Sequence, residues 1–130
     1  MQILHAGRYG YHPLSVSSMA VKAPINPFTP QALGARGVES TIRDYVRSAV
    51  LAREAGYDGV EVMGSEGYLI NQFVSPQVNA RHDAWGGSAE KRRRFAVEIV
   101  SRMREAVGLD FIIIYRLSML ELVDKGSAWD

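Results

Sequence analysis

Polar side chains capable of chemistry directly follow two apolar stretches of this sequence. Glu66 and Tyr68 come just after residues 59–63, and Arg116 comes directly after residues 111–115. A phenol can protonate a carbon that has gained negative charge, since a free tyrosine with a pKa of about 10 keeps its proton at neutral pH. A guanidinium can stabilise negative charge on a bound group. These residue types suit a reaction in which a substrate gains an electron pair and then a proton.

The two apolar stretches have the features of buried strands. Residues 59–63 read GVEVM behind a turn at Asp58, and residues 111–115 read FIIIY. Both are long enough for a strand and too short for a helix. Residues 1–4 predict a further strand at the start of the chain. The sequence therefore predicts three strands, each followed by polar residues.

Amphipathic patterns predict two helices between these strands. The first runs from residue 35 or 39 to residue 55, and the second runs to about residue 107 with Ser88 as its N-cap. Residues 69–73 predict a short helical turn, and residues 9–34 predict an irregular loop. The order strand, helix, strand, helix, strand predicts a parallel α/β sheet, in which functional side chains gather at the carboxyl ends of the strands.

The composition excludes several classes of protein. The 130 residues are 47% hydrophobic and 22% charged, as expected of one ordinary globular domain. No cysteine is present, so the chain offers no disulfide and no thiolate ligand. The three histidines, His5, His12 and His82, do not have the spacing of metal ligands. The sequence therefore predicts no metal site within the chain.

Charge and hydropathy predict neither a nucleic-acid partner nor a membrane. The net charge is +1, and the one basic cluster, residues 91–94, fits the solvated face of a helix better than a nucleic-acid patch. No apolar run approaches the ~20 residues that span a bilayer, and the N-terminus lacks the features of a signal peptide. We therefore expect a cytoplasmic location.

Four segments of the chain resemble one family of enzymes. Residues 57–73 (YDGVEVMGSEGYLINQF) resemble the fourth strand and following loop of the Old Yellow Enzyme family of FMN-dependent oxidoreductases. Within this family, the segment GSEGYLINQF most resembles the bacterial 2,4-dienoyl-CoA reductases. Residues 79–95 resemble the family's Asn, Arg, Asp, aromatic, Gly-Gly-Ser loop and the Arg-rich helix start that follows it. QILHAGRY at residues 2–9 and IIIYRLSM at residues 112–119 fit the same order.

The resemblance implies an α/β fold, a (β/α)8 TIM barrel of which this chain holds only a part. Three strands cannot close a barrel that needs eight. We therefore expect residues 1–130 to be an incomplete segment of a single FMN-binding barrel domain. The segment would comprise about strands three to five with the intervening helices.

The resemblance also implies FMN-dependent reduction of 2,4-dienoyl-CoA thioesters in fatty acid β-oxidation, with electrons from NADPH. In the full-length relatives FAD and an iron–sulfur cluster relay these electrons. Both would lie outside this chain, which has no cysteine to ligate a cluster. A histidine that acts with the catalytic tyrosine would lie on a later strand. The isolated chain is therefore expected to bind FMN weakly or not at all and to be inactive.

The matched motifs imply roles for particular residues. Tyr68 corresponds to the proton donor, while Gln2 and Arg116 correspond to residues that contact the flavin. An amide can both donate to and accept from the flavin ring. Arg116 would stabilise the negative charge that develops when the ring is reduced.

Two further residues are candidates for substrate binding. Glu66 would line the substrate pocket or orient Tyr68, and an exposed loop acid is the alternative. His5 would face the cofactor or the acyl chain, and a structural histidine is the alternative. Many relatives have a histidine and an asparagine, or two histidines, where this chain has Met63 and Glu66. This departure disfavours enone substrates and agrees with the dienoyl-CoA branch.

Three other readings of the sequence remain open. One is another branch of the same family, an ene-reductase acting on enones or an amine dehydrogenase. A second is a non-catalytic barrel remnant or interaction module, although two open sheet edges would favour aggregation of such a piece. A third is nucleic-acid binding through residues 91–94, which predicts association that weakens steeply with salt.

Overall fold

The computed structural model describes residues 1–122 as a three-stranded sheet, a two-stranded ladder and four helical segments. The order along the chain is β1 (Gln2–Ile3), η1 (Gly7–Tyr9), β2 (Val16–Ser17), β3 (Gln31–Ala32), α1 (Ala35–Glu54), β4 (Gly59–Gly64), α2 (Leu69–Val74), α3 (Ala89–Val107) and β5 (Ile112–Leu117). The last eight residues of the predicted domain, 123–130, lie outside the described part. Within residues 1–122, no helix has both the length and the apolar character needed to cross a membrane.

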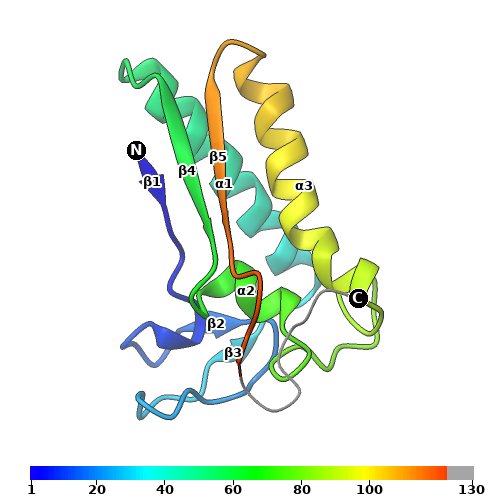
Figure 1. The fold of residues 1–130 in the computed structure, drawn as a ribbon. Helices are drawn as coiled ribbons and strands as arrows, with labels where there is room; N and C mark the ends of the chain where they lie inside the picture. The colour runs from blue at the N-terminus through cyan, green and yellow to red at the C-terminus, as the bar shows by residue number, and fades with distance from the viewer. Residues whose placement is uncertain (123–130) are drawn as a thin grey trace.

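The main sheet is parallel and has the order β1-β4-β5. Helices α1 and α3 lie side by side against one face of this sheet, and the long strands β4 and β5 run along them (Figure 1). The prediction of an α/β fold with parallel strands and intervening helices is confirmed. Because the strands are parallel, their carboxyl ends lie at one edge of the sheet.

Successive side chains of β4 and β5 point to opposite faces of the sheet. Val60 and Val62 belong to the hydrophobic core with the helices, and Ile113 packs against that core. On the other face Ile112 is 55% exposed and Ile114 is 52% exposed. Within residues 1–122, only the helical face of β5 is therefore covered, as expected of an incomplete barrel segment.

The segment between β1 and α1 is less irregular than the sequence indicates. Strands β2 and β3 form a short parallel ladder that pairs Val16 with Gln31 and Ser17 with Ala32. Each strand has only two residues, so it leaves no periodic pattern in the sequence. Strand β1 is also shorter than the predicted strand over residues 1–4.

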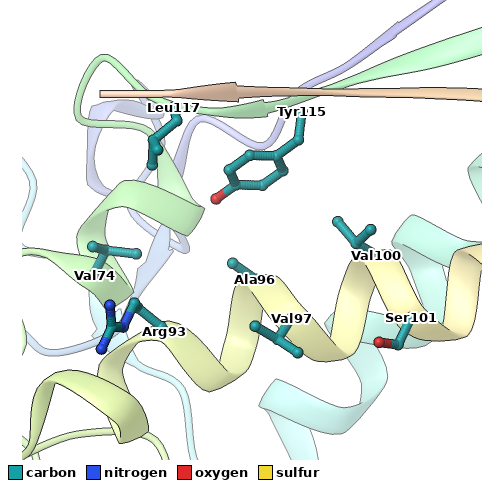
Figure 2. A pocket seen from close by; sticks show the side chains of 8 residues that line it. All are labelled: Val74, Arg93, Ala96, Val97, Val100, Ser101, Tyr115 and Leu117. Atoms are coloured by element: carbon teal, nitrogen blue, oxygen red, sulfur yellow. The ribbon is translucent and has the colours of Figure 1, made fainter. Parts of the chain in front are cut away.

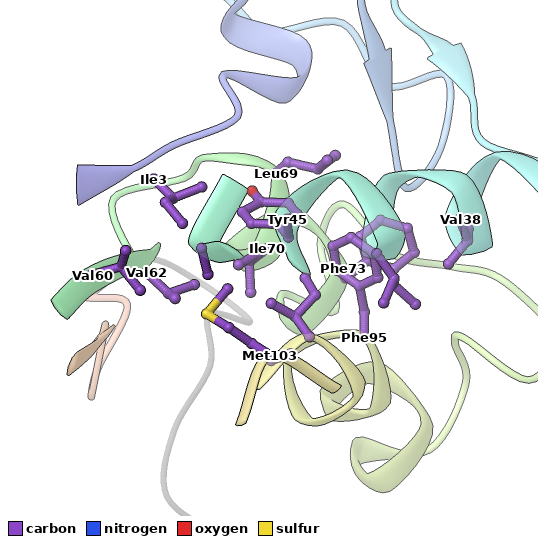
Figure 3. Packing of buried hydrophobic residues seen from close by; sticks show 14 of the residues in the cluster. Ile3, Val38, Tyr45, Val60, Val62, Leu69, Ile70, Phe73, Phe95 and Met103 are labelled. Atoms are coloured by element: carbon purple, nitrogen blue, oxygen red, sulfur yellow. The ribbon is translucent and has the colours of Figure 1, made fainter. Parts of the chain in front are cut away.

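Phe95 on α3 lies in the middle of the hydrophobic core (Figure 3). Its ring stacks on Phe73 of α2 with the centroids 4.2 Å apart, and it meets Tyr45 and Trp85 edge-on at 6.4 Å. Both phenylalanines are completely buried. One aromatic cluster therefore joins α1, α2, α3 and the loop that precedes α3.

The loop before α3 is fastened by Arg81. Its Nη1 donates to the carbonyl oxygens of Ser18 at 2.7 Å and Leu33 at 2.6 Å. Its Nε and Nη2 donate to the two carboxylate oxygens of Asp83 at 3.0 and 2.6 Å. Arg81 thus ties the β2–β3 segment to the loop that leads into α3.

We expect Asp83→Asn to lower the free energy of unfolding by about 1 kcal/mol at pH 7, the upper range for a partly exposed bidentate pair. Hydrogen bonds from Arg81 hold the pKa of the Asp83 carboxyl below its ordinary value. This stabilisation is complete above that ordinary value and is lost as the pH falls through the lower pKa of the folded protein. Urea unfolding at pH 7 and pH 3 should show the variant approaching the parent at the lower pH. Asp110→Asn, at an exposed carboxyl, is the control and should change little at either pH.

Candidate active site

The predicted flavin residues lie on the sheet face that the helices leave open. Gln2 of β1 is level with Glu61 of β4, and Met63 of β4 is level with Arg116 of β5. Gln2 and Arg116 therefore approach β4 from its two neighbouring strands. Glu61 is level with Ile114 of β5. Arg116 lies two residues further along β5, nearer the carboxyl edge of the sheet.

Glu61 connects the two predicted flavin residues. The Nε2 of Gln2 donates to the Oε1 of Glu61 at 2.6 Å, and the same carboxylate oxygen lies 4.0 Å from the Nη1 of Arg116. Sequence reasoning did not single out Glu61. A usable signal existed, because it is an acid within an apolar strand, at the position that faces away from Val60 and Val62.

Glu66 pairs with Arg116 rather than with Tyr68. Its Oε1 lies 2.8 Å from the Nη2 of Arg116, and its backbone N–H donates to the hydroxyl of Ser118 at 3.1 Å. Glu66 has a φ of 62°, a left-handed backbone conformation that is uncommon for any residue but glycine. The loop thus turns its carboxylate toward the end of β5. Of the two roles predicted for Glu66, the contacts favour a place in the pocket wall over the orientation of Tyr68.

Tyr68 is the N-cap residue of α2, at the end of the loop that follows β4. Its carbonyl oxygen accepts the backbone N–H of Gln72 at 2.9 Å, and its ring meets that of Tyr9 edge-on with the centroids 6.0 Å apart. Tyr68 and Arg116 therefore lie at the same carboxyl edge of the sheet, on segments that follow or end adjacent strands. Glu66, two residues before Tyr68 in the same loop, contacts Arg116.

The loop that carries Tyr68 is fixed by Gln72, a buried residue that sequence reasoning missed. The Oε1 of Gln72 accepts from the backbone N–H of Arg8 at 3.1 Å and from the hydroxyl of Ser17 at 2.9 Å, while its Nε2 donates to the carbonyl of Gly67 at 2.7 Å. Gly7, with a φ of +59°, makes room for it, since a Cβ there would lie 2.2 Å from the same oxygen. No local sequence pattern reports such long-range hydrogen bonds.

His5 lies at the end of β1 and holds the following turn. Its Nδ1 accepts the backbone N–H of Gly7 at 3.0 Å, and its carbonyl oxygen accepts the backbone N–H of Leu69 at 3.0 Å. Burial lowers the pKa of the imidazole, which therefore stays neutral at pH 7. These contacts give His5 a structural role at the start of α2, and its predicted contact with substrate stays a prediction.

A polar pocket of about 360 Å³ opens beside the Tyr68 loop. Its wall includes Arg8, Tyr9, Glu66, Gly67, Gln72, Ser118 and Glu121. The Nε of Arg8 is buried and makes no hydrogen bond within the part of the chain that the structure describes. The pocket thus combines a guanidinium with carboxylates at the carboxyl edge of the sheet.

An apolar pocket of about 370 Å³ lies on the opposite, helical side of the sheet, between α3 and β5 (Figure 2). It is lined by Val74, Arg93, Ala96, Val97, Val100, Ser101, Tyr115 and Leu117. Burial raises the pKa of the Tyr115 phenol to about 12. Because Tyr115 and Arg116 are adjacent in a strand, they face opposite sides, and this pocket is separate from the candidate active site.

The family model described as the NADH:flavin oxidoreductase / NADH oxidase family matches residues 1–129. The chain belongs to this family. The family predicted from the sequence, that of Old Yellow Enzyme, is therefore confirmed.

Relatives of this oxidoreductase family member are much longer than the chain. An NADH oxidase of Thermoanaerobacter brockii is 42% identical over 134 residues, which cover 98% of this chain and 20% of the relative. An NADH:acrylate oxidoreductase of Vibrio harveyi is 37% identical over 144 residues, which cover all of this chain and 14% of the relative. The chain thus spans about a fifth or less of the length of these relatives.

Solved structures agree with the family assignment. A 2-naphthoyl-CoA reductase in complex with 2-naphthoyl-CoA superposes with a TM-score of 0.90 at 33% identity, over 97% of this chain and 22% of that protein. Morphinone reductase in complex with tetrahydroNAD gives a TM-score of 0.87 at 29% identity, over 98% of this chain and 40% of that protein. The predicted fold, part of an Old Yellow Enzyme type TIM barrel, is confirmed. These relatives do not distinguish the 2,4-dienoyl-CoA branch or NADPH from the alternatives.

Proposed function

We propose that residues 1–130 form about strands three to five of the barrel of an FMN-dependent oxidoreductase that reduces a conjugated acyl-CoA thioester, such as a 2,4-dienoyl-CoA. The observation that carries the proposal is the alignment of Gln2, Glu61 and Arg116 on the open face of the sheet, next to the loop that presents Tyr68. An amide and a guanidinium on one face, beside a phenol at the carboxyl edge, match the needs of flavin-dependent reduction of a double bond.

The donor set of the open face fits the pyrimidine edge of FMN. That edge presents carbonyl oxygens on either side of an N–H, so it needs both donors and an acceptor. Gln2 offers an amide oxygen and Arg116 offers several N–H donors. When bound, FMN supplies the hydride. Arg116 would place a positive charge at the pyrimidine edge, where it would favour added negative charge, and Gln2 would hold that edge by hydrogen bonds.

Tyr68 supplies the proton in the proposed reaction. Hydride addition to a conjugated thioester leaves negative charge shared between the thioester oxygen and a carbon along the conjugated chain. The phenol of Tyr68 donates its proton to that carbon, and the phenolate is reprotonated from solvent through the open carboxyl edge. Glu66 holds Arg116 from the loop side, which keeps the guanidinium next to the sheet face.

Two features support a thioester substrate. Met63 and Glu66 stand where many enone reductases carry the side chains that hold a carbonyl oxygen, and a similar structure contains an aromatic CoA thioester. The competing candidate is an ene-reductase acting on enones or other activated alkenes. It is favoured by the likeness to morphinone reductase and to an NADH:acrylate oxidoreductase.

The full-length protein that contains these residues is expected to purify with FMN, and also with FAD and an iron–sulfur cluster. It should reduce a 2,4-dienoyl-CoA with NADPH at a kcat/KM at least tenfold above that for 2-cyclohexenone or acrylate. Flavin chromatography after heat release, followed by steady-state assays with each substrate and with NADPH or NADH, checks this. A preference for the enone or acrylate would select the competing candidate, and a preparation without flavin would refute both.

The 130-residue chain alone is expected to bind FMN no more tightly than the micromolar range. Its three strands leave the flavin face open, and the phosphate-binding loops of such barrels follow strands seven and eight. Fluorescence titration of FMN with the purified chain measures this affinity. Sub-micromolar binding accompanied by dienoyl-CoA reduction would show that this segment is sufficient.

A further inference from the structure

We propose that Glu61 is a positioning residue of the flavin site, which fixes the orientation of the Gln2 amide and offsets part of the charge of Arg116. The inference rests on the proposed binding of FMN to the open face of the sheet. In this role Glu61 contacts neither the substrate nor the transferred proton. It controls how Gln2 and Arg116 interact with the flavin.

The contact between Gln2 and Glu61 can have only one orientation. A carboxylate accepts hydrogen bonds and cannot donate them, so the amide must turn its NH₂ group toward Glu61. The 2.6 Å distance between Nε2 and Oε1 agrees with such a charge-assisted bond. The Oε1 of Gln2 is then directed away from Glu61 and has no partner within residues 1–122. It is available as an acceptor for an N–H donor, and the pyrimidine edge of a flavin has one.

Glu61 also lies within electrostatic range of Arg116. The guanidinium has Glu66 at 2.8 Å on the loop side and Glu61 at 4.0 Å on the strand side. Glu61 therefore reduces the positive potential that Arg116 presents to the open face. Since a reduced flavin is more negative than an oxidised one, Glu61 should hold the midpoint potential of a flavin bound there below the value that Arg116 alone would set.

A simple cross-strand pair is the alternative explanation for this contact. Such a pair would add slightly to the stability of the sheet and would change neither flavin affinity nor potential. An acid on a strand between two apolar residues is an unusual choice for that purpose alone, because Val60 and Val62 already fix the register of β4 through the core. The two explanations differ in what the isosteric change Glu61→Gln does to the flavin.

The experiment uses the full-length holoprotein and the variant Glu61→Gln. A glutamine at this position can donate or accept, so the Gln2 amide loses its fixed orientation, and the Kd of oxidised FMN is expected to rise about tenfold. Loss of the negative charge should raise the preference for reduced over oxidised flavin about tenfold, which corresponds to about 30 mV for a two-electron couple. Flavin titration and equilibration with reference dyes measure the two quantities. Glu105→Gln, on the exposed face of α3, is the matched control and should change neither.

Exchanging the two side chains tests whether flavin binding depends on the position of the carboxylate or only on the presence of the pair. The variant Q2E/E61Q keeps one carboxylate, one amide and the contact between β1 and β4, so its thermal stability should match that of the parent. It places the carboxylate where the amide oxygen faces the flavin, and FMN affinity should fall below that of Glu61→Gln alone. If the exchange instead restores the affinity of the parent, the pair is merely structural and the inference is wrong.

The remaining outcomes distinguish this inference from the proposed function. A parent protein that binds FMN, together with a Glu61→Gln variant of unchanged affinity and potential, would overturn the role of Glu61 alone. A parent protein that binds no flavin would overturn the proposed function and this inference with it.

Discussion

The substitution Tyr68→Phe is expected to slow the reduction of a 2,4-dienoyl-CoA by about 10²- to 10³-fold, within the range for loss of a general acid. The variant keeps the ring, its edge-on contact with Tyr9 and the N-cap position of α2. It loses only the phenolic proton. FMN affinity and the reduction of the flavin by NADPH should therefore remain at the level of the parent, because neither step needs that proton.

Stopped-flow measurement of the two half-reactions in the full-length protein checks this expectation. The half-reaction in which substrate reoxidises the flavin should carry the whole loss of rate. Tyr57→Phe is the control, since that tyrosine is half exposed and precedes the amino end of β4. A Tyr68→Phe variant that reoxidises at the rate of the parent would assign the proton to another donor. Equal losses in both half-reactions would indicate a damaged site instead.

The elements that carry local signals were predictable from the sequence. Strand β4 covers Gly59–Gly64 where the sequence predicted residues 59–63, because a turn and a glycine loop enclose a short β-branched run. Helix α3 begins after Ser88, whose hydroxyl accepts the backbone N–H of Lys91 at 3.3 Å. In both cases the residues that specify the element lie within a few positions of it, so its boundaries can be predicted from the local sequence.

The contacts of the candidate site were not predictable to the same extent, because they join distant parts of the chain. Gln2 and Glu61 are 59 residues apart, and Arg8 and Gln72 are 64 residues apart. Periodicity assigns Glu61 to a face of its strand, but only the pairing of β1 with β4 identifies its partner. The matched motifs identified Gln2 and Arg116 separately, but they did not identify Glu61, whose carboxylate lies between them.

The exposed face of β5 shows a second limit of sequence reasoning. An all-apolar strand is typical of a strand buried on both sides. Ile112 and Ile114 satisfy that pattern, yet both are about half exposed in the described chain. The apolar pattern of β5 therefore fits the strand's environment in a complete barrel rather than its environment in the isolated segment. In the full-length barrel these residues would face the interior, and their exposure in the isolated segment is a reason to expect aggregation.

The largest effect on stability is expected from Phe95→Ala, which should lower the free energy of unfolding of the 130-residue chain by 3–5 kcal/mol. Phe95 is completely buried and is the one ring that contacts Phe73, Tyr45 and Trp85 together in the described aromatic pairs. Alanine would leave a cavity where α1, α2 and α3 meet. A domain whose total stability is about 5–15 kcal/mol would lose a large part of it.

Urea unfolding followed by circular dichroism measures this loss, with Val97→Ala as the control two residues further along α3. Val97 is 59% exposed and lines the apolar pocket of Figure 2, so its truncation should change stability by less than about 0.5 kcal/mol in the isolated chain. The same Val97→Ala change in the full-length protein should cost more, because the barrel would cover this side of α3 with its next helix. If Val97→Ala lowers the free energy of unfolding only slightly in both proteins, α3 stays uncovered in the full-length protein. If it lowers the stability of the isolated chain as much as Phe95→Ala does, copies of the isolated chain already associate across this pocket.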